Sequence, residues 1–88
     1  MRNIITTKIF DKAFLKISER NEILQKEILI AIRLLELDVK NPKLKTHKLS
    51  GNLKDFSACR VNYSIRILFK FDDENVYLET VGTHDDVY

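Results

Sequence analysis

The stretch YSIRILFKF, residues 63–71, decides the fold of this chain. Its apolar residues recur at every second position, and Arg66, Leu68 and Lys70 occupy the positions between them. Successive side chains of a β-strand point to opposite faces. The stretch therefore predicts a strand with two cations on one face and, on the other, an apolar stripe that needs a cover. That stripe consists of Ile65, Ile67, Phe69 and Phe71.

Further strands are predicted on both sides of this stretch. Asp72–Asn75 is a polar turn, and Val76–Val81 is the partner strand, which Gly82 and Thr83 bring to an end. Upstream, Lys45–Ser50 and Leu53–Asn62 form two more strands. Strands that follow one another through tight turns must be antiparallel.

The turn between these two upstream strands is Ser50–Asn52. Gly51 or Asn52 is expected to adopt a positive φ there, because these two residue types tolerate left-handed backbone.

The first half of the chain is helical apart from a short opening strand over Asn3–Thr7. From Lys8 the apolar residues follow helical spacing. A second helix is expected over Asn21–Asp38, and it is so apolar that it must be covered on more than one side, by the rest of the domain or by another chain. Asn41 and Pro42 end it, because a residue before proline disfavours the helical region.

The order strand, helix, helix and then strands predicts an α+β fold. Two N-terminal helices pack on one face of a twisted, mainly antiparallel sheet of four to five strands, and residues 1–88 form a single domain. The other face of the sheet would be uncovered and would display Arg66.

Composition narrows the function classes. The 88 residues are 44% apolar and 32% charged, which is typical of a globular protein. No apolar run approaches the roughly 18 residues of a spanning helix, and no signal peptide is visible, so a cytoplasmic protein without membrane contact is expected. Cys59 is the one cysteine, which rules out an internal disulfide, and neither a metal site nor a cofactor is predicted. The net charge is +2, with five lysines and no acid from Lys40 to Lys54.

Five residues of the second half could cleave a phosphodiester. RNA supplies its own nucleophile in the 2′-hydroxyl. The reaction then needs a proton acceptor, a proton donor and positive charge at the phosphate. Histidine serves as either acid or base near neutral pH, and arginine carries a fixed charge on a fork that matches phosphate oxygens. An antiparallel sheet can gather such groups into one patch, and the candidates are His47, Arg60, Arg66, His84 and Tyr88.

Each candidate also has a simpler explanation. Arg66 could pair with Glu79 across the hairpin, a contact worth roughly 0.2–1 kcal/mol. His47 could be an ordinary polar strand residue, His84 could cap the chain end, and the Tyr88 ring could pack on the core. Cys59 is expected to face the helices as a small buried apolar residue rather than to act as a nucleophile. Asp85 and Asp86 are expected to form a solvated tail, with Asp85 or Asp86 steering His84 as an alternative.

Three motifs resemble the RelE/ParE toxin superfamily, and within it the YafQ-like ribonuclease toxins. They are HKLSG at residues 47–51, CRVNYSIRILF at residues 59–69 and VGTHDDVY at residues 81–88. The resemblance implies a toxin of a type II toxin–antitoxin pair that cleaves mRNA, usually on the ribosome, without a cofactor. Its partners would be the ribosome, mRNA and a cognate antitoxin in a hetero-oligomer.

By position, the resemblance implies that His47 and His84 are the catalytic histidines, that Arg66 holds the phosphate, and that Tyr88 is the terminal aromatic residue of the site. It also implies backbone contacts by three lysines, Lys45, Lys48 and Lys54.

The chain departs from the YafQ-like pattern at two positions. Arg60 stands where these toxins tend to have histidine, and Ser64 stands where they tend to have aspartate. We expect Arg60 to add charge to the transition state, while His47 and His84 serve as base and acid in either order. The alternatives are a ParE-like inhibitor of DNA gyrase without nuclease activity, and an inactive relative that only binds an antitoxin.

Overall fold

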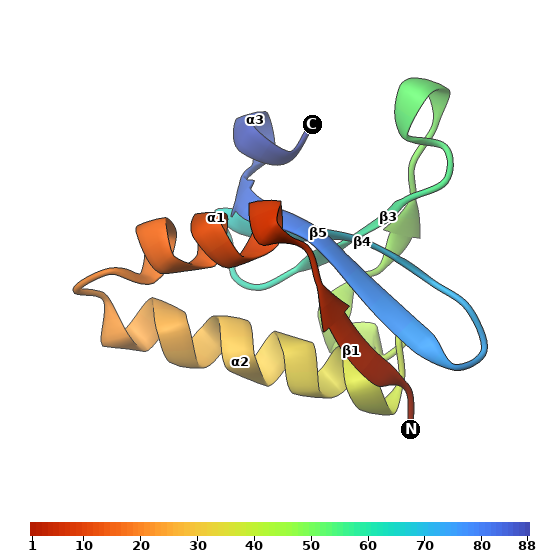
Figure 1. The fold of residues 1–88 in the computed structure, drawn as a ribbon, viewed down its shortest axis with the longest axis horizontal. Helices are drawn as coiled ribbons and strands as arrows, with labels where there is room; N and C mark the ends of the chain where they lie inside the picture. The colour runs from red at the N-terminus through yellow and green to blue at the C-terminus, as the bar shows by residue number, and fades with distance from the viewer.

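A computed structural model describes all residues, 1–88, and shows two helices on one side of a five-stranded sheet (Figure 1). The elements, in chain order, are β1 (Asn3–Thr6), α1 (Lys8–Ser18), α2 (Glu22–Leu37), β2 (His47–Lys48), β3 (Ser57–Arg60), β4 (Ile65–Phe71), β5 (Asn75–Thr83) and α3 (His84–Val87). Single turns of 3-10 helix lie at Pro42–Leu44 and Gly51–Leu53. Neither α1 nor α2 has the length and apolar content that a bilayer-spanning helix requires.

Local signals place both long helices where they were predicted. Thr7 precedes α1, and its hydroxyl accepts a hydrogen bond from the Phe10 amide at 2.9 Å. Asn21 precedes α2, and its side-chain oxygen accepts from the Leu24 amide at 3.0 Å. Such caps satisfy amides that have no partner inside the helix. The predicted bounds of the second helix, Asn21–Asp38, are thus its two caps.

The strand order across the sheet is β1-β5-β4-β3-β2. β1 runs parallel to β5, and the other pairs are antiparallel. This confirms the predicted α+β class and the mainly antiparallel sheet. The stretch from which the fold was predicted contains β4, the central strand.

The apolar stripe of β4 faces the helices, as predicted. Ile65, Ile67 and Phe69 belong to the buried core, and the partly buried Phe71 packs against it. Ile28 and Leu35 of α2 supply the helical side of this core, and both are fully buried. Residues on the outer side of α2 stay exposed, so the helix is covered by its own chain on one side only. The large apolar ones among them are Ile23, Leu29, Ile30 and Leu37.

The strand predictions upstream of β4 were too long. Only His47 and Lys48 of the predicted strand over Lys45–Ser50 form a paired strand, and β3 begins at Ser57 rather than at Leu53. The 3-10 turn at Gly51–Leu53 takes up the intervening residues, with φ of 64° at Gly51. The positive φ expected at Gly51 or Asn52 is thus found at Gly51.

The downstream half of the sheet contains a bulge. Leu68 pairs with Thr80 and Phe69 pairs with Leu78, so Glu79 has no partner on β4. Because of this extra residue, Leu78 and Val81 both face the core although they are three residues apart. β5 ends at Thr83, as the Gly82–Thr83 stop predicted, but it is two residues longer than the predicted strand, which ended at Val81.

The face of the sheet opposite the helices is not entirely uncovered. α3 contacts β4 and β5, and in Figure 1 it lies at the end of β5, above the sheet. Ala58 and Leu68 form a cross-strand pair on this face, and both are buried outside the main core, as is Val87 of α3. The last turn of the chain therefore covers part of the face that was expected to be bare.

Candidate active site

Tyr88 brings the two histidines together, although β3 and β4 lie between the strand that carries His47 and the strand that His84 follows. His47 is on the edge strand β2, and His84 begins α3 directly after β5. The Tyr88 hydroxyl lies 3.4 Å from His47 Nε2, and the Tyr88 ring meets the His84 ring edge-on, with centroids 4.4 Å apart. The Tyr88 ring therefore lies between the two imidazoles.

α3 folds back onto the end of β5, and this change of direction depends on Gly82 and Thr83. The Thr83 hydroxyl accepts from the Asp86 amide at 3.3 Å, and Asp86 Oδ2 accepts from the Thr83 amide at 3.1 Å. This is a reciprocal capping box. A Cβ atom at Gly82 would lie 2.8 Å from Asp86 Cβ, so glycine allows the helix to fold back onto the strand. Asp86 is therefore a structural residue, and the prediction of a purely solvated tail was wrong for it.

Each histidine has its Nδ1 atom near an oxygen atom of a residue close to it in the sequence. His47 Nδ1 lies 3.3 Å from the Lys45 carbonyl oxygen. If Nδ1 donates there, Nε2 keeps a lone pair. His84 Nδ1 lies 3.8 Å from Asp85 Oδ1, an ion pair when the imidazole is protonated. Both histidines are exposed and open to a substrate.

Arg60 and Arg66 face each other across β3 and β4. Both donate to the carbonyl oxygen of Asn62, Arg60 through Nε at 3.2 Å and Arg66 through Nη1 at 2.7 Å. Neither forms an ion pair, so the pairing of Arg66 with Glu79 is not present; the strand partner of Arg66 is Gly82. Two facing cations without a carboxylate leave a positive potential that an anion would relieve.

One edge of the Arg66 guanidinium has no protein partner. All its hydrogen bonds use Nη1, which donates to the carbonyl oxygens of Asn62, Tyr63 and Ile65. Nε and Nη2 form the adjacent edge of the planar fork, and this edge matches two phosphate oxygens. The turn before β4 thus fixes the fork while leaving its binding edge open.

Arg66 lies close enough to Tyr88 to affect its hydroxyl. Partial burial raises the pKa of the Tyr88 phenol above its ordinary value, and the positive charge of Arg66 opposes this increase. The phenol is therefore a neutral hydrogen-bonding group at neutral pH. His47 pairs with Ala58, and Ala58 and Arg60 are two residues apart on β3. His47 and the arginine pair therefore lie on the same face of the sheet, where Tyr88 contacts both histidines.

Cys59 takes no part in this arrangement. It is fully buried among core residues, as predicted, and desolvation raises the pKa of its thiol to about 12. A thiol with this pKa stays protonated and poorly nucleophilic at physiological pH.

We expect Cys59 to resist alkylation by iodoacetamide at pH 8 while the protein is folded, and to react fully in denaturant. Mass spectrometry of the two samples measures this. Equal labelling in both would contradict the burial of the thiol.

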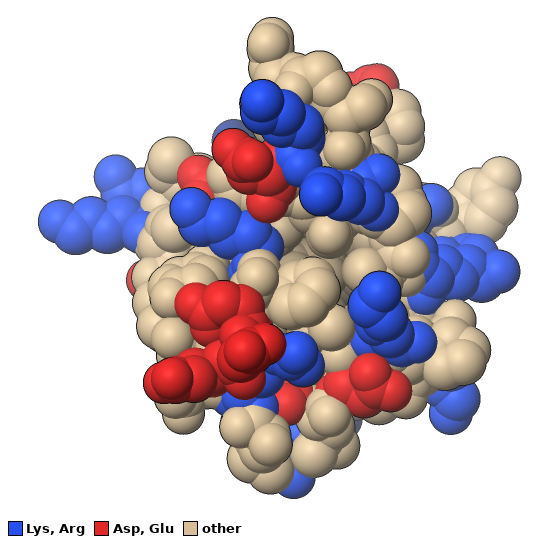
Figure 2. Space-filling view, turned by 90° about the vertical axis from the view of Figure 1, so that its right-hand side faces the viewer, with Lys and Arg blue, Asp and Glu red and all other residues tan.

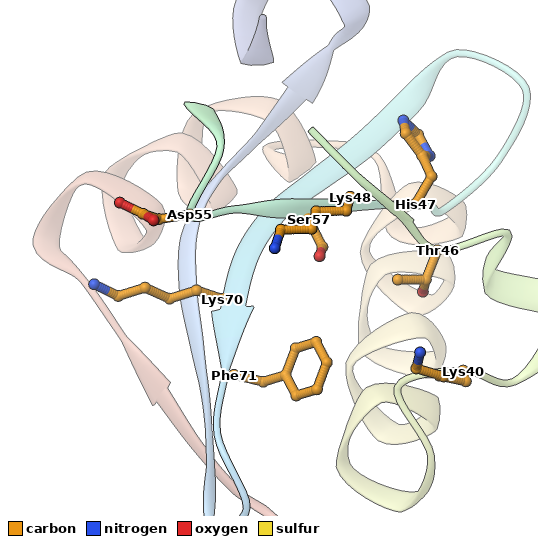
Figure 3. A pocket seen from close by; sticks show the side chains of 8 residues that line it. All are labelled: Lys40, Thr46, His47, Lys48, Asp55, Ser57, Lys70 and Phe71. Carbon is orange, nitrogen blue, oxygen red and sulfur yellow. The ribbon is translucent and has the colours of Figure 1, made fainter. Parts of the chain in front are cut away.

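The sequence anticipated only part of the basic surface. Of the three predicted lysines, Lys48 lines a cleft beside His47, whereas Lys45 and Lys54 are exposed in the flanking turns and do not line it. Lys40 and Lys70 do line it (Figure 3). Lys70 was recognisable, because it shares the outward positions of β4 with Arg66. No cluster of three or more His, Cys, Asp or Glu side chains is placed to hold a metal ion.

Comparison with known proteins identifies the family. Residues 2–88 match the family described as "Bacterial toxin of type II toxin-antitoxin system, YafQ". The chain belongs to the YafQ toxin family. This confirms the resemblance drawn from the three motifs. YafQ-family toxins are ribosome-dependent mRNA interferases, so this chain is a type II toxin with endoribonuclease activity and a cognate antitoxin as partner.

Solved structures agree with this YafQ-family fold. YafQ from E. coli strain BL21(DE3) is 19% identical with a TM-score of 0.83, and the match covers 100% of this chain and 99% of that one. YafQ in the E. coli DinJ–YafQ complex is 20% identical, with a TM-score of 0.81 and the same coverage. A metal-bound toxin from Helicobacter pylori is 29% identical, with a TM-score of 0.77 and 100% coverage of both chains. No curated protein sequence matches the chain.

Proposed function

We propose that this YafQ-family toxin cleaves mRNA at the surface formed by His47, Arg60, Arg66, His84 and Tyr88. The observation that carries the proposal is the open Nε–Nη2 edge of Arg66 next to two histidines that flank Tyr88. The scissile phosphate would bind this edge, and Arg60 would add a second positive charge. Both charges stabilise the phosphorane, which carries more negative charge than the bound phosphate.

The proton transfers follow from the surroundings of the histidines. His47 Nε2 takes the proton of the 2′-hydroxyl, whose oxygen attacks the adjacent phosphorus. His84 gives a proton to the departing 5′-oxygen. The products are a 2′,3′-cyclic phosphate and a free 5′-hydroxyl. Of the two orders that the sequence left open, this one fits the Lys45 carbonyl beside His47 and the Asp85 carboxylate beside His84.

Tyr88 is a positioning residue in this scheme. Its hydroxyl contacts His47 and its ring contacts His84, so one side chain holds both imidazoles. Because the substrate is mRNA bound to the ribosome, we also propose that the toxin acts in the cytoplasm. It would form a hetero-oligomer with its antitoxin between periods of activity.

The pH dependence of cleavage tests the acid and base roles. The wild-type toxin should show a bell-shaped profile of kcat/KM on ribosome-bound mRNA. His47→Ala and His84→Ala should each lower the maximum by roughly 10²-fold. His47→Ala should remove the acidic limb and His84→Ala the alkaline limb.

The result is interpreted by comparing Tyr88→Phe with Tyr88→Ala, and the histidine variants with the wild-type toxin. Tyr88→Phe keeps the ring against His84 and should lower the rate less than Tyr88→Ala does, while shifting the limb that belongs to His47. Wild-type profiles in both histidine variants would refute the acid–base assignment. Analysis of the product ends for a 2′,3′-cyclic phosphate tests the attack by the 2′-hydroxyl separately.

A further inference from the structure

A cleft of about 530 Å³ lies next to the candidate active site, at the far end of β4 (Figure 3). It exists because β4 is longer than β3. Ser57, the first residue of β3, pairs with Phe69, whereas β4 continues through Lys70 and Phe71. These two residues form one side of the cleft, and β2, the start of β3 and the segments before these two strands form the rest. The volume lies within the range of ligand-binding pockets.

The cleft is basic. Lys40, Lys48 and Lys70 line it together with a single carboxylate, Asp55, and none of the three lysines forms an ion pair. In Figure 3 the Lys70 ammonium and the Asp55 carboxylate lie on one side of the cleft and Lys40 on the other. Figure 2 shows that basic side chains surround the middle of this side of the molecule, while the largest acidic group is gathered at the lower left. The excess positive charge favours an anionic ligand.

The cleft also offers aromatic surface. The half-buried Phe71 ring lies between the Lys70 and Lys40 sides in Figure 3, with the Arg2 guanidinium 5.2 Å from its centroid. The Lys70 ammonium is 5.8 Å from the centroid of the Phe56 ring and 6.0 Å from that of the Tyr77 ring, although neither ring lines the cleft. Aromatic rings beside cations are the usual platform for single-stranded nucleic acid, because bases stack on rings while the cations hold the phosphates.

His47 is shared by the candidate active site and the cleft. It contacts Tyr88 in the candidate active site, and it also stands at the rim of the cleft (Figure 3). An RNA strand whose scissile phosphate lies at Arg66 therefore has the cleft within reach of the neighbouring nucleotides. We propose that the cleft is a subsite for single-stranded RNA next to the cleavage point, where Lys40 and Lys70 hold flanking phosphates from its two sides and Phe71, between them, contacts a base. This inference rests on the proposed nuclease site.

A double variant, Lys40→Gln with Lys70→Gln, tests the subsite in the full-length toxin. The probe is an mRNA with a 2′-O-methyl group at the cleavage position, which binds but cannot be cut. Its affinity should fall, and the slope of log affinity against log salt should become shallower by about 0.7 for each phosphate of a single strand that is no longer neutralised. The matched control is Lys12→Gln with Lys16→Gln, which removes the same charge from exposed positions of α1 and should leave the slope closer to wild type.

Truncation of the substrate shows which nucleotides the cleft binds. Cleavable mRNAs that end one or two nucleotides beyond the scissile phosphate, on the 5′ or the 3′ side, should be cut more slowly by the wild-type toxin on one of the two sides. The Lys40/Lys70 variant should be insensitive to that truncation, because its cleft no longer binds the flanking phosphates. This change in sensitivity cannot arise from a general decrease in charge.

The outcomes separate the two proposals. If the wild-type toxin cuts mRNA and the Lys40/Lys70 variant matches the α1 control in affinity, salt slope and truncation sensitivity, the subsite is refuted and the nuclease site stands. If the wild-type toxin neither binds nor cuts ribosome-bound mRNA, the proposed function itself fails. If the variant cuts normally but binds its antitoxin less tightly, the cleft holds an acidic protein segment instead, and the RNA subsite is refuted.

Discussion

Replacing Arg66 by alanine is expected to lower kcat/KM for mRNA cleavage by roughly 10³-fold, the upper range for loss of a preorganised charged donor at a transition state. The substitution removes the open Nε–Nη2 edge and leaves Arg60 as the only guanidinium at the phosphate. Cleavage of ribosome-bound mRNA by purified toxin, followed over time, measures the effect.

Arg66→Lys separates charge from geometry. Lysine keeps the positive charge but has no planar fork and cannot bind three carbonyl oxygens while presenting a second edge. We expect it to recover only a minor part of the lost rate. Arg20→Ala, in the exposed turn between α1 and α2, is the matched control and should cleave at the wild-type rate.

The fold of the Arg66 variants must be checked, because Nη1 also ties together the turn before β4. Urea denaturation supplies this check. A variant that unfolds like wild type but does not cleave supports the phosphate role. Full toxicity and full cleavage by Arg66→Ala would refute the proposed site.

The largest expected effect on stability is that of Phe69→Ala, which should lower the free energy of unfolding by about 3–5 kcal/mol. Phe69 is fully buried at the centre of β4, and its ring lies 6.0 Å from that of Phe71. Removing it leaves a cavity between the sheet and the helices that an 88-residue domain can ill tolerate, since the total stability of small proteins is only about 5–15 kcal/mol.

Leu15→Ala is the control for this experiment. Leu15 is also a large apolar residue, but it is 68% exposed on α1, so its truncation should change stability by no more than about 0.5 kcal/mol. Urea denaturation followed by circular dichroism gives both values. Equal losses in the two variants would contradict the packing of β4 against the helices.

The sequence predicted those parts of the fold that short-range rules determine. The helical spacing of the apolar residues and the alternation through β4 are local signals, and both helices and the central strand followed from them. The strand around His47 was overestimated, because β2 has only two paired residues and its length is set by pairing with β3 rather than by its own composition.

The residue types of the candidate site could be predicted from the sequence, but the contacts between those residues could not. Facing positions for Arg60 and Arg66 depend on the register between β3 and β4, which a sequence does not fix. The contacts of Tyr88 with both histidines depend on α3, which is a single turn and too short for any periodic pattern. Its one local signal was available in the sequence, a threonine followed three residues later by an acidic residue that caps the turn.

The bulge at Glu79 has a consequence for engineering the C-terminal region. If β5 kept Glu79 but paired regularly with β4, Val81 would lie opposite Arg66. Every β5 side chain after Glu79 would then point to the other face of the sheet, and α3 would start on the face that the helices cover. Shortening β5 by Glu79 alone would instead restore simple alternation and keep Gly82 opposite Arg66. Glu79 is thus not needed for the pairing of β5 with β4. Its carbonyl oxygen accepts a hydrogen bond from the Thr7 hydroxyl at 2.9 Å. A designer can therefore remove one residue here without reversing the direction in which Tyr88 is presented, provided that the start of α1 is secured by other means.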